Sequence, residues 1–203
     1  YTKFGTIDTS YNWSGEEHYR ETSDGIRINS AQGYFTMTCD TTSGNSHGSW
    51  IGLGGVVSDY FWQAIWSAKS ETFLYQYYIP SQSGPELLYE STMPIGSWRC
   101  GDIAFMYVAY DNMYPNGVEA FVEDTQTGYS NASWRTEYAQ QLETAYTDKE
   151  TAEWIDERAE CANGLFHFGG YGTVYWDETG FSYSNTPSMT YEPIDYDSYY
   201  AQL

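Results

Sequence analysis

The sequence predicts an all-β domain built as an antiparallel sandwich. Aromatic residues make up 19% of the 203 residues, and 22 of them are Tyr. Aromatic and β-branched side chains favour strands because they pack well on a pleated, half-buried surface. Nineteen glycines, together with Ser and Asn, interrupt these runs at short intervals, as expected where turns connect strands. Short strands at this spacing are typical of sandwiches and barrels.

The predicted strands follow one another along most of the chain. Turn signals such as Pro115-Asn116-Gly117 and Gln126-Thr127-Gly128 separate them. Neither an internal repeat nor a linker divides the sequence, so we expect residues 1–203 to form a single domain. The strands are expected at residues 34–38, 49–53, 60–66, 73–79, 103–109, 118–123, 165–168 and 173–176.

The segment 135–160 differs from this pattern. It is rich in Glu, Ala, Gln and Lys, residues that favour a helix. We therefore expect a helix in its first part. The alternation in Ala152-Glu153-Trp154-Ile155 would also suit a strand, so the local sequence leaves the structure at Glu153 open.

The charge of the chain is strongly negative. There are 28 acidic residues against 8 Lys and Arg, a formal net charge of −20 at pH 7. Nucleic acid and anionic membranes would be repelled, so neither is expected as a partner. When the carboxylates protonate, the charge reaches only about +12, which limits self-repulsion and suits work at low pH. Salt-loving proteins have the same excess of acidic over basic residues, so adaptation to salt is the alternative explanation.

Two features, the start of the chain and two glycosylation sequons, predict a secreted protein. The chain begins at Tyr1 without a signal-peptide pattern, as a processed mature form would. Cys39, Cys100 and Cys161 allow one disulfide and one thiol, and the sequence leaves the pairing open. Glycosylation sequons begin at Asn12 and Asn131. We expect a secreted monomer.

Two short aromatic segments supply the candidate catalytic groups. Phe61-Trp62-Gln63-Ala64 carries a carboxamide and Ala152-Glu153-Trp154-Ile155 carries a carboxylate. A carboxylate that activates water and an amide N–H₂ that binds an oxyanion suffice to hydrolyse a peptide bond without a serine, thiol or metal. The three histidines show no metal-ligand spacing. We therefore expect no metal and no cofactor.

These two segments belong to a larger set that resembles the glutamic peptidases known as eqolisins. The matching segments occur in the family's order and cover most of the chain. They are residues 10–15 (family element Asn-Trp-Gly-Gly), 49–55 (Trp-Val-Gly-Ile-Asp-Gly), 61–64 (Leu-Leu-Gln-Ala/Thr-Gly), 74–78 (Trp-Tyr-Glu-Trp-Tyr), 101–103 (Gly-Asp-x-Ile), 123–128 (Glu-Asn-x-Thr-Thr-Gly) and 152–157 (Ala-Glu-Trp-Ile-x-Glu).

The resemblance implies both a fold and an activity. The fold is a bent sandwich of two large antiparallel sheets, concanavalin-like or jelly-roll-like, with a cleft on the concave face. The activity is that of a secreted acid endopeptidase acting on polypeptides, made as a zymogen and insensitive to pepstatin. Glu153 would be the general base and acid, and Gln63 would stabilise the oxyanion. The implied substrate-binding residues are Trp13, Trp50, Gln76 and Tyr78.

Two departures from the family pattern affect the expected pH dependence. The family's Asp after Trp-Val-Gly-Ile is Gly54 here, and the Glu of Trp-Tyr-Glu-Trp-Tyr is Gln76. Fewer neighbouring negative charges make ionisation of a carboxyl easier. We therefore expect the activity of Glu153 to extend to low pH.

Two alternatives come from other functional classes. One is a jelly-roll glycoside hydrolase, because residues 75–79 resemble the nucleophile strand Glu-Tyr-Tyr-Ile of small xylanases. Its nucleophile position would hold Gln76, which cannot form the covalent intermediate that retaining hydrolysis needs. The other is a non-catalytic carbohydrate-binding sandwich, which explains the aromatic residues but gives Gln63 and Glu153 no role.

Overall fold

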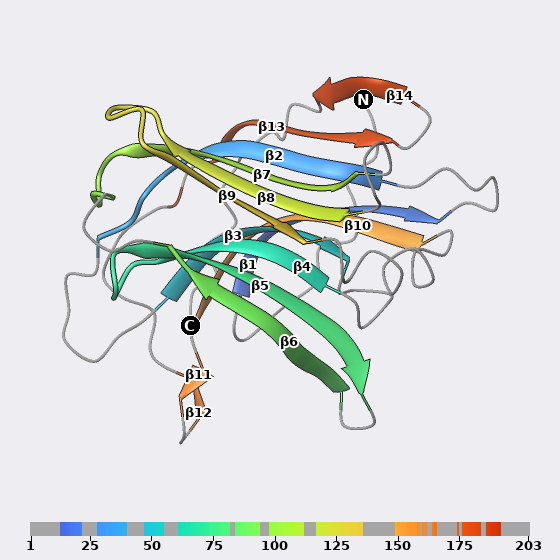
Figure 1. The fold of residues 1–203 in the computed structure, drawn as a ribbon, viewed down its shortest axis with the longest axis horizontal. Coiled ribbons are helices and arrows are strands. Elements are labelled where there is room, and N and C mark those ends of the chain that lie inside the picture. The colour runs from blue at the N-terminus through green and yellow to red at the C-terminus, as the bar shows by residue number, and fades with distance from the viewer. Residues whose placement is uncertain are drawn as a thin grey trace.

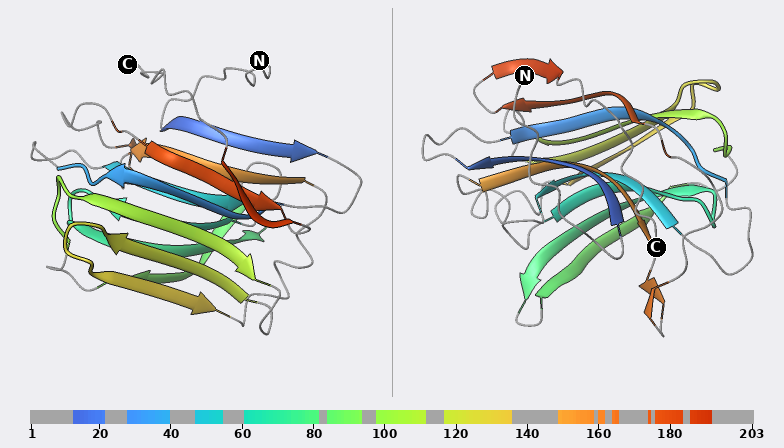
Figure 2. Two further views of the ribbon diagram at one scale, coloured as in Figure 1. Left: turned by 90° about the horizontal axis from the view of Figure 1, so that it is seen from above. Right: turned by 180° about the vertical axis from the view of Figure 1, so that it is seen from behind.

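The computed structural model is a sandwich of two six-stranded antiparallel sheets, which confirms the predicted fold class (Figure 1). It describes residues 13–21, 28–39, 47–54, 61–81, 84–93, 98–111, 117–135, 149–158, 160–161, 164–165, 174, 176–183 and 186–191. No helix occurs within these ranges. Seen from above, the strands of the two layers run in similar directions (Figure 2), as in aligned sandwiches.

The first sheet contains the segments that carry the candidate site. Its strand order is β1-β10-β3-β4-β5-β6. The hairpins from β3 to β6 form a meander, and β10 enters from far along the chain between β1 and β3. In Figure 1, β5 and β6 bend away from the other sheet, so the outer face of this sheet is concave. The strands are β1 (Trp13–Glu21), β3 (His47–Gly54), β4 (Phe61–Ser67), β5 (Thr72–Ser81), β6 (Gly84–Thr92) and β10 (Lys149–Arg158).

The second sheet packs on the inner face of the first. Its strand order is β14-β13-β2-β7-β8-β9, again antiparallel throughout. A separate two-stranded ribbon joins β11 (Glu160–Cys161) and β12 (Gly164–Leu165). The strands of the second sheet are β2 (Ile28–Thr36), β7 (Ile103–Asp111), β8 (Gly117–Asp124), β9 (Ser130–Arg135), β13 (Trp176–Tyr183) and β14 (Thr186–Tyr191).

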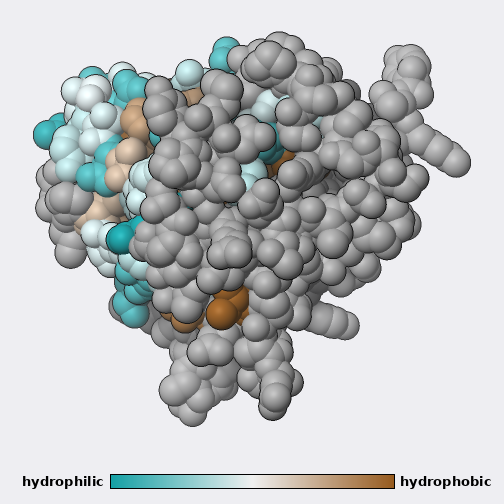
Figure 3. Space-filling view, turned by 45° about the vertical axis from the view of Figure 1, so that its right-hand side comes forward, coloured by the Kyte–Doolittle hydropathy of each residue, from teal (hydrophilic) through white to brown (hydrophobic). Residues whose placement is uncertain are grey.

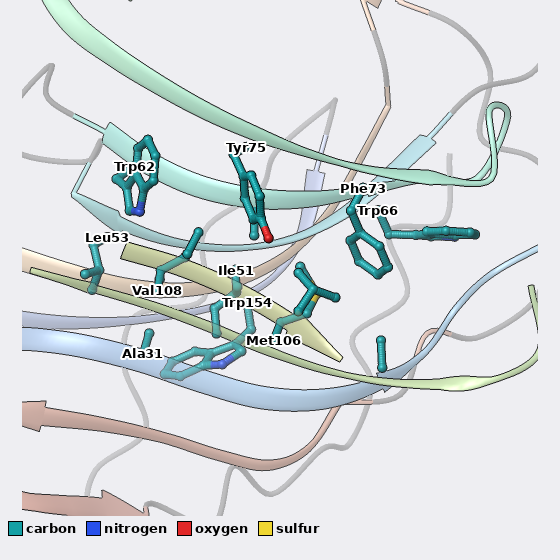
Figure 4. Packing of buried hydrophobic residues seen from close by; sticks show 14 of the residues in the cluster. Ala31, Ile51, Leu53, Trp62, Trp66, Phe73, Tyr75, Met106, Val108 and Trp154 are labelled. Carbon is teal, nitrogen blue, oxygen red and sulfur yellow. The ribbon is translucent and has the colours of Figure 1, made fainter. Parts of the chain in front are cut away.

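The core between the sheets is made of large aromatic side chains. Trp62, Phe73 and Tyr75 of the first sheet point towards Met106 and Val108 of β7 (Figure 4). All five are at most 1% exposed. Aromatic side chains of this size bury about 150–250 Å² each and dominate the energetics of such cores.

Three of these aromatic residues also bind the backbone of the opposite sheet. Trp62 Nε1 donates to the carbonyl of Glu119 at 2.9 Å, and Trp154 Nε1 donates to the carbonyl of Gln32 at 2.8 Å. Tyr75 Oη donates to the carbonyl of Asn131 at 2.8 Å. A buried indole N–H or phenol O–H without a hydrogen-bond partner would destabilise the folded protein. These bonds therefore favour the one alignment of the two sheets in which all three donors have partners.

The disulfide pairing that the sequence left open is Cys39–Cys100, with Cα atoms 5.0 Å apart. It joins the end of β2 to the turn before β7. Backbone bonds reinforce the same junction, from Met37 N to Asp102 O at 2.9 Å and from Gly101 N to Met37 O at 2.7 Å.

Five of the predicted central strands are confirmed, namely those now seen as β3, β4, β5, β7 and β8. The strand predicted at residues 34–38 begins earlier, at Ile28. The prediction for 173–176 is wrong except at its last residue, because Val174 is outside any strand and β13 begins at Trp176. At 165–168 only Leu165 is described, as the end of β12.

The open question at Glu153 is resolved as a strand. Ala152 and Trp154 of β10 lie in the core, and Glu153 points to the other face. The residues where we predicted a helix, after Arg135 at the end of β9, are outside the described ranges. Core packing at Ala152 and Trp154 thus overrides the helical propensity around Glu153.

The described part of the surface in Figure 3 is mainly hydrophilic or intermediate, with small hydrophobic areas. The large hydrophobic side chains that are exposed, Leu87, Ile103 and Trp134, lie on three different strands. In the described residues, no helix is long and apolar enough to cross a membrane.

A tyrosine–arginine pair joins the edge strands β6 and β9 of the two sheets. Arg135 Nη2 donates to Tyr89 Oη, and its guanidinium carbon lies 3.9 Å from the centre of the Tyr89 ring. Partial burial raises the pKa of Tyr89. Hydrogen bonds with Ser91, Arg135 and Ser133 and the charge of Arg135 outweigh burial and lower that pKa below its ordinary value. The opposite holds for Tyr75, where burial, and next the charge of Glu119, raise the pKa.

We predict that Tyr89→Phe removes a phenol that ionises before ordinary tyrosines, whereas Tyr75→Phe removes one that ionises after them. Because the pKa of Tyr89 is lowered on folding, its ionisation favours the folded state. The stabilisation is complete above the ordinary tyrosine pKa and is lost as the pH falls through the lowered one. Phenolate absorbance and urea unfolding of wild type and variants measure both effects. Equal alkaline stability profiles for wild type and Tyr89→Phe would contradict the prediction.

Candidate functional site

A row of facing residues crosses five strands of the first sheet. Glu153 of β10 pairs with Gly52 of β3, which pairs with Gln63 of β4. Gln63 pairs with Gln76 of β5, which pairs with Glu90 of β6. We call these five residues the polar row. The residues next to Gln63 and Glu153 in sequence lie in the core, so alternation along a strand turns Gln63 and Glu153 to the outer, concave face.

Gly52 lies between the two candidate catalytic residues, and aromatic rings occupy the space above it. Neighbouring strands lie ~4.8 Å apart, so the backbones of Glu153 and Gln63 lie about 10 Å apart on either side of Gly52. A Cβ atom at Gly52 would lie 2.5 Å from Cε2 of Phe61 and 3.0 Å from Cζ3 of Trp50. Only glycine therefore leaves room for these two rings above β3.

Both candidate catalytic side chains are buried. Glu153 is 3% exposed and Gln63 is 4% exposed. Burying a carboxyl or an amide costs free energy unless hydrogen bonds replace water. The partners of each group therefore indicate which chemical state the fold supports.

The carboxyl of Glu153 is bonded to the hydroxyl of Thr151. Thr151 Oγ1 lies 2.8 Å from Glu153 Oε1 and 3.0 Å from the carbonyl oxygen of Gly54. A hydroxyl has one proton but can also accept. When Glu153 is ionised, Thr151 can donate to it. When Glu153 is protonated, it can donate to Thr151, which then donates to Gly54. The same geometry therefore supports both protonation states.

The carboxamide of Gln63 is held from the other side. Its Nε2 donates to Oε1 of Gln76 at 2.7 Å, and Tyr78 Oη donates to the same oxygen at 3.2 Å. The Nε2 atom of Gln76 in turn donates to Glu90 Oε2 at 2.6 Å. Gln63 Oε1 is buried without a hydrogen-bond partner in the described residues. One of the two Nε2 protons of Gln63 is thus used by Gln76.

Aromatic rings lie along the polar row on the same face. The ring centres of Trp50 and Phe61 are 5.0 Å apart, and those of Phe61 and Tyr78 are 5.9 Å apart. Trp50 Nε1 donates to Glu157 Oε2 at 3.1 Å. Trp50 and Phe61 come from opposite sides of the polar row, and their rings meet above Gly52.

The structure brings five of the six predicted site residues onto one face. Gln63, Glu153, Trp50, Gln76 and Tyr78 all point to the outer side of the first sheet, as the register requires. Trp13 lies on β1 opposite Glu157, and its side chain is outside the described part of the structure. Its role in binding stays a prediction.

Sequence reasoning missed three members of this region. Thr151 and Phe61 each lie two residues before a predicted catalytic residue, so strand alternation could have found them. Glu90 could not be found in this way, because its place depends on the pairing of β5 with β6, which contains an irregularity between Tyr77 and Tyr78.

Backbone conformation explains why Gly54 stands where the family pattern has an aspartate. Gly54 adopts φ = 82°, a left-handed conformation that costs side-chain-bearing residues energy. Its carbonyl oxygen accepts from Thr151. At this point the site therefore offers Glu153 the hydroxyl of Thr151, itself next to the Gly54 carbonyl, rather than a second carboxylate. Within the described ranges, no group of three His, Cys, Asp or Glu side chains is arranged to hold a metal ion.

Comparison with known proteins supports the fold. No family model and no curated protein matches the sequence. Among solved structures, scytalido-glutamic peptidase with a peptide-based transition-state analog matches with a TM-score of 0.60 and 15% identity, covering 88% of this chain and 82% of that chain. SCP-B, a member of the eqolisin family solved with the tripeptide Ala-Ile-His, matches with a TM-score of 0.57 and 15% identity, covering 84% and 79%.

A phage module has a similar architecture. The CBM2 module of the evolved Dit protein of Lactobacillus casei BL23 phage J-1 matches with a TM-score of 0.53 and 9% identity, covering 89% of this chain and 79% of that chain. Identities this low show a shared sandwich fold, and the fold alone does not decide between functions.

We predict that Gly52→Ala destabilises the protein by about 1–3 kcal/mol, the usual cost of forcing a methyl group into a packed site. The added Cβ would overlap the Phe61 ring. Combining it with Phe61→Leu should recover part of the loss, because the smaller side chain makes room for the added Cβ. The double-mutant cycle isolates the energy of this contact. Urea unfolding of the wild type, both single variants and the double variant provides the measurement. Additive losses would show that Phe61 does not close over Gly52.

Proposed function

We propose that this protein is an acid endopeptidase in which Glu153 activates water and Gln63 stabilises the oxyanion. The observation that carries the proposal is their shared register position. A buried carboxyl and a buried carboxamide flank Gly52, which has no side chain, on one concave face. Similarity of the fold to two glutamic peptidases supports the same reading.

The first step is the attack of water on the scissile carbonyl. Ionised Glu153 removes a proton from a water molecule as the oxygen–carbon bond forms. Thr151 donates a hydrogen bond to Oε1 of Glu153, which leaves Oε2 to act as the base. The carboxylate is mostly shielded from solvent, so its hydrogen bond with Thr151 helps to stabilise the ionised form.

The carbonyl oxygen becomes negative during this step. Gln63 has a second Nε2 proton besides the one donated to Gln76, and we assign that proton to the oxyanion. A preorganised donor of this kind contributes about 3 kcal/mol to catalysis. Because the amide is neutral, it donates equally well at acidic and neutral pH.

The second step returns the proton. Protonated Glu153 donates to the departing amine nitrogen as the carbon–nitrogen bond breaks, which regenerates the carboxylate. While Oε2 of Glu153 holds the proton, Oε1 still accepts a hydrogen bond from Thr151. The Thr151 hydroxyl therefore has a partner throughout the cycle.

Surroundings and composition agree with this chemistry. The rings of Trp50, Phe61 and Tyr78 lie along the polar row, and a low local dielectric strengthens the bond between Gln63 and the oxyanion. We further propose polypeptide substrates and secretion. The Cys39–Cys100 disulfide supports secretion, because disulfides persist in oxidising compartments, and the low Lys and Arg content supports work in acid.

The two alternatives explain less of the site. A retaining glycoside hydrolase needs a carboxylate nucleophile, and the position that resembles it holds Gln76, whose amide is already bonded to Gln63 and Glu90. A carbohydrate-binding sandwich fits the fold similarity to the phage module. It does not explain why a carboxyl and an amide are both buried on the concave face.

We predict that Glu153→Gln abolishes cleavage of denatured casein in acid, whereas Gln63→Ala leaves a residual rate about 10²–10³ times lower than wild type. Losing the base removes water activation, and losing the donor removes one hydrogen bond to the transition state. Glu123→Gln, which removes a carboxylate from the second sheet, is the matched control and should retain the wild-type rate. Near-normal cleavage by Glu153→Gln, or cleavage of xylan by the wild type, would overturn the proposal.

A second prediction concerns pH. Gln76→Glu adds negative charge to the polar row, which disfavours ionisation of Glu153 and should move the acid limb of the kcat/KM profile to higher pH. The new carboxyl would lie directly beside Glu90. The double variant Gln76→Glu, Glu90→Gln avoids that pair, keeps the formal charge of the wild type and should move the limb in the same direction. An acid limb that stays in place or moves to lower pH in both variants would contradict this view of the electrostatics.

A further inference from the structure

We propose that Glu90, an exposed residue on the edge strand β6, sets the direction in which the Gln63 amide presents its donor. Glu90 would act through Gln76 without contacting substrate, so it is a positioning residue. The catalytic consequence rests on the proposed role of Gln63. The structural part stands on the hydrogen bonds alone.

The observation is an unbroken series of side-chain hydrogen bonds across three strands. Gln63 Nε2 donates to Gln76 Oε1 at 2.7 Å, and Gln76 Nε2 donates to Glu90 Oε2 at 2.6 Å. The three residues face one another in the register of β4, β5 and β6. The series begins at a buried residue and ends at an exposed one.

Two amides in contact do not choose a direction by themselves. Each carboxamide has a donor end and an acceptor end, and a pair of them bonds equally well when both are turned over. An ionised carboxylate can only accept. At its end of the series, Glu90 therefore requires the Nε2 side of Gln76.

This requirement passes along the series. With Nε2 of Gln76 turned to Glu90, its Oε1 is turned to Gln63, and Tyr78 Oη supports that orientation by donating to the same oxygen at 3.2 Å. Gln63 must then present Nε2 to Gln76. If Gln63 turned over, two amide oxygens would face each other.

The direction matters because only one end of the Gln63 amide can stabilise an oxyanion. In the observed orientation Nε2 keeps a second proton, and Oε1 has no partner in the described residues. In the opposite orientation the oxygen would be held by Gln76, and the place of Nε2 in the site would change. The family pattern has a carboxylate at the position of Gln76. In this chain the carboxylate lies on the next strand outward, at Glu90.

The structural test uses the side-chain amide signals of Gln63 and Gln76 in NMR spectra, assigned with Gln63→Ala and Gln76→Ala. Glu90→Lys replaces an acceptor with a donor, so it should reverse the series and shift the signals of both amides. Glu71→Lys, an equal change of charge at the exposed turn between β4 and β5, should leave them in place. Unchanged Gln63 signals in Glu90→Lys would overturn the proposal.

The catalytic test compares kcat and KM on a peptide substrate. Glu90→Lys should lower kcat at least about 10-fold with KM little changed, the signature of an interaction made only in the transition state. Glu90→Gln, which permits either direction, should have a smaller effect. Gln76→Glu, Glu90→Gln places an acceptor-only group directly beside Gln63 and should restore kcat. No recovery, with Gln63 signals again like wild type, would overturn the catalytic part.

The two tests separate this proposal from the proposed function. A wild-type protein that cleaves no peptide would refute the peptidase function, and the amide signals would still decide whether Glu90 sets the direction of Gln63. An active enzyme whose kcat ignores Glu90→Lys, despite shifted signals, would refute the catalytic role of Glu90 and leave the peptidase function intact.

Discussion

The antiparallel pairing of β10 with β3 is the constraint on which the site depends. It places Glu153 opposite Gly52, and the pairing of β3 with β4 places Gln63 on the other side of the same glycine. A shift of β10 by one residue would turn Glu153 into the core and Trp154 out of it. The register is therefore held by the burial of Ala152 and Trp154. The energy that keeps the carboxyl of Glu153 in place comes from its apolar neighbours in sequence.

The aromatic residues between the sheets extend this control to the whole sandwich. The indoles of Trp62 and Trp154 are buried, and each donates its single N–H to a backbone carbonyl of the opposite sheet. Both residues are direct neighbours of a proposed catalytic residue. Alternation along the strand then sends Gln63 and Glu153 outward whenever these indoles point inward. Packing on one face thus positions chemistry on the other.

The strands that sequence patterns found are interior strands, and most of the missed ones are edge strands; the interior strand β13 was also missed, except at Trp176. β3, β4, β5, β7 and β8 are interior strands, and their aromatic and aliphatic residues made them recognisable. The four edge strands β1, β6, β9 and β14 were all missed. Edge strands carry polar and charged residues and Pro, which discourage pairing with other molecules, as in the segments of β6 with Pro85 and β14 with Pro187. The interior strand β10 was left open because its polar residues also suit a helix.

The sequence by itself determined the all-β class, the strand that carries Gln63 and the acidic character of the chain. These properties depend on composition and on alternation within single strands, both of which are local. Only the tertiary structure decided the Cys39–Cys100 pairing, the strand at Glu153, the hydroxyl of Thr151 beside Glu153 and the link from Glu90 to Gln63. Each of these depends on which strands become neighbours. That choice is made by burial of the whole core, because the local sequence around Glu153 and Glu90 is compatible with more than one arrangement.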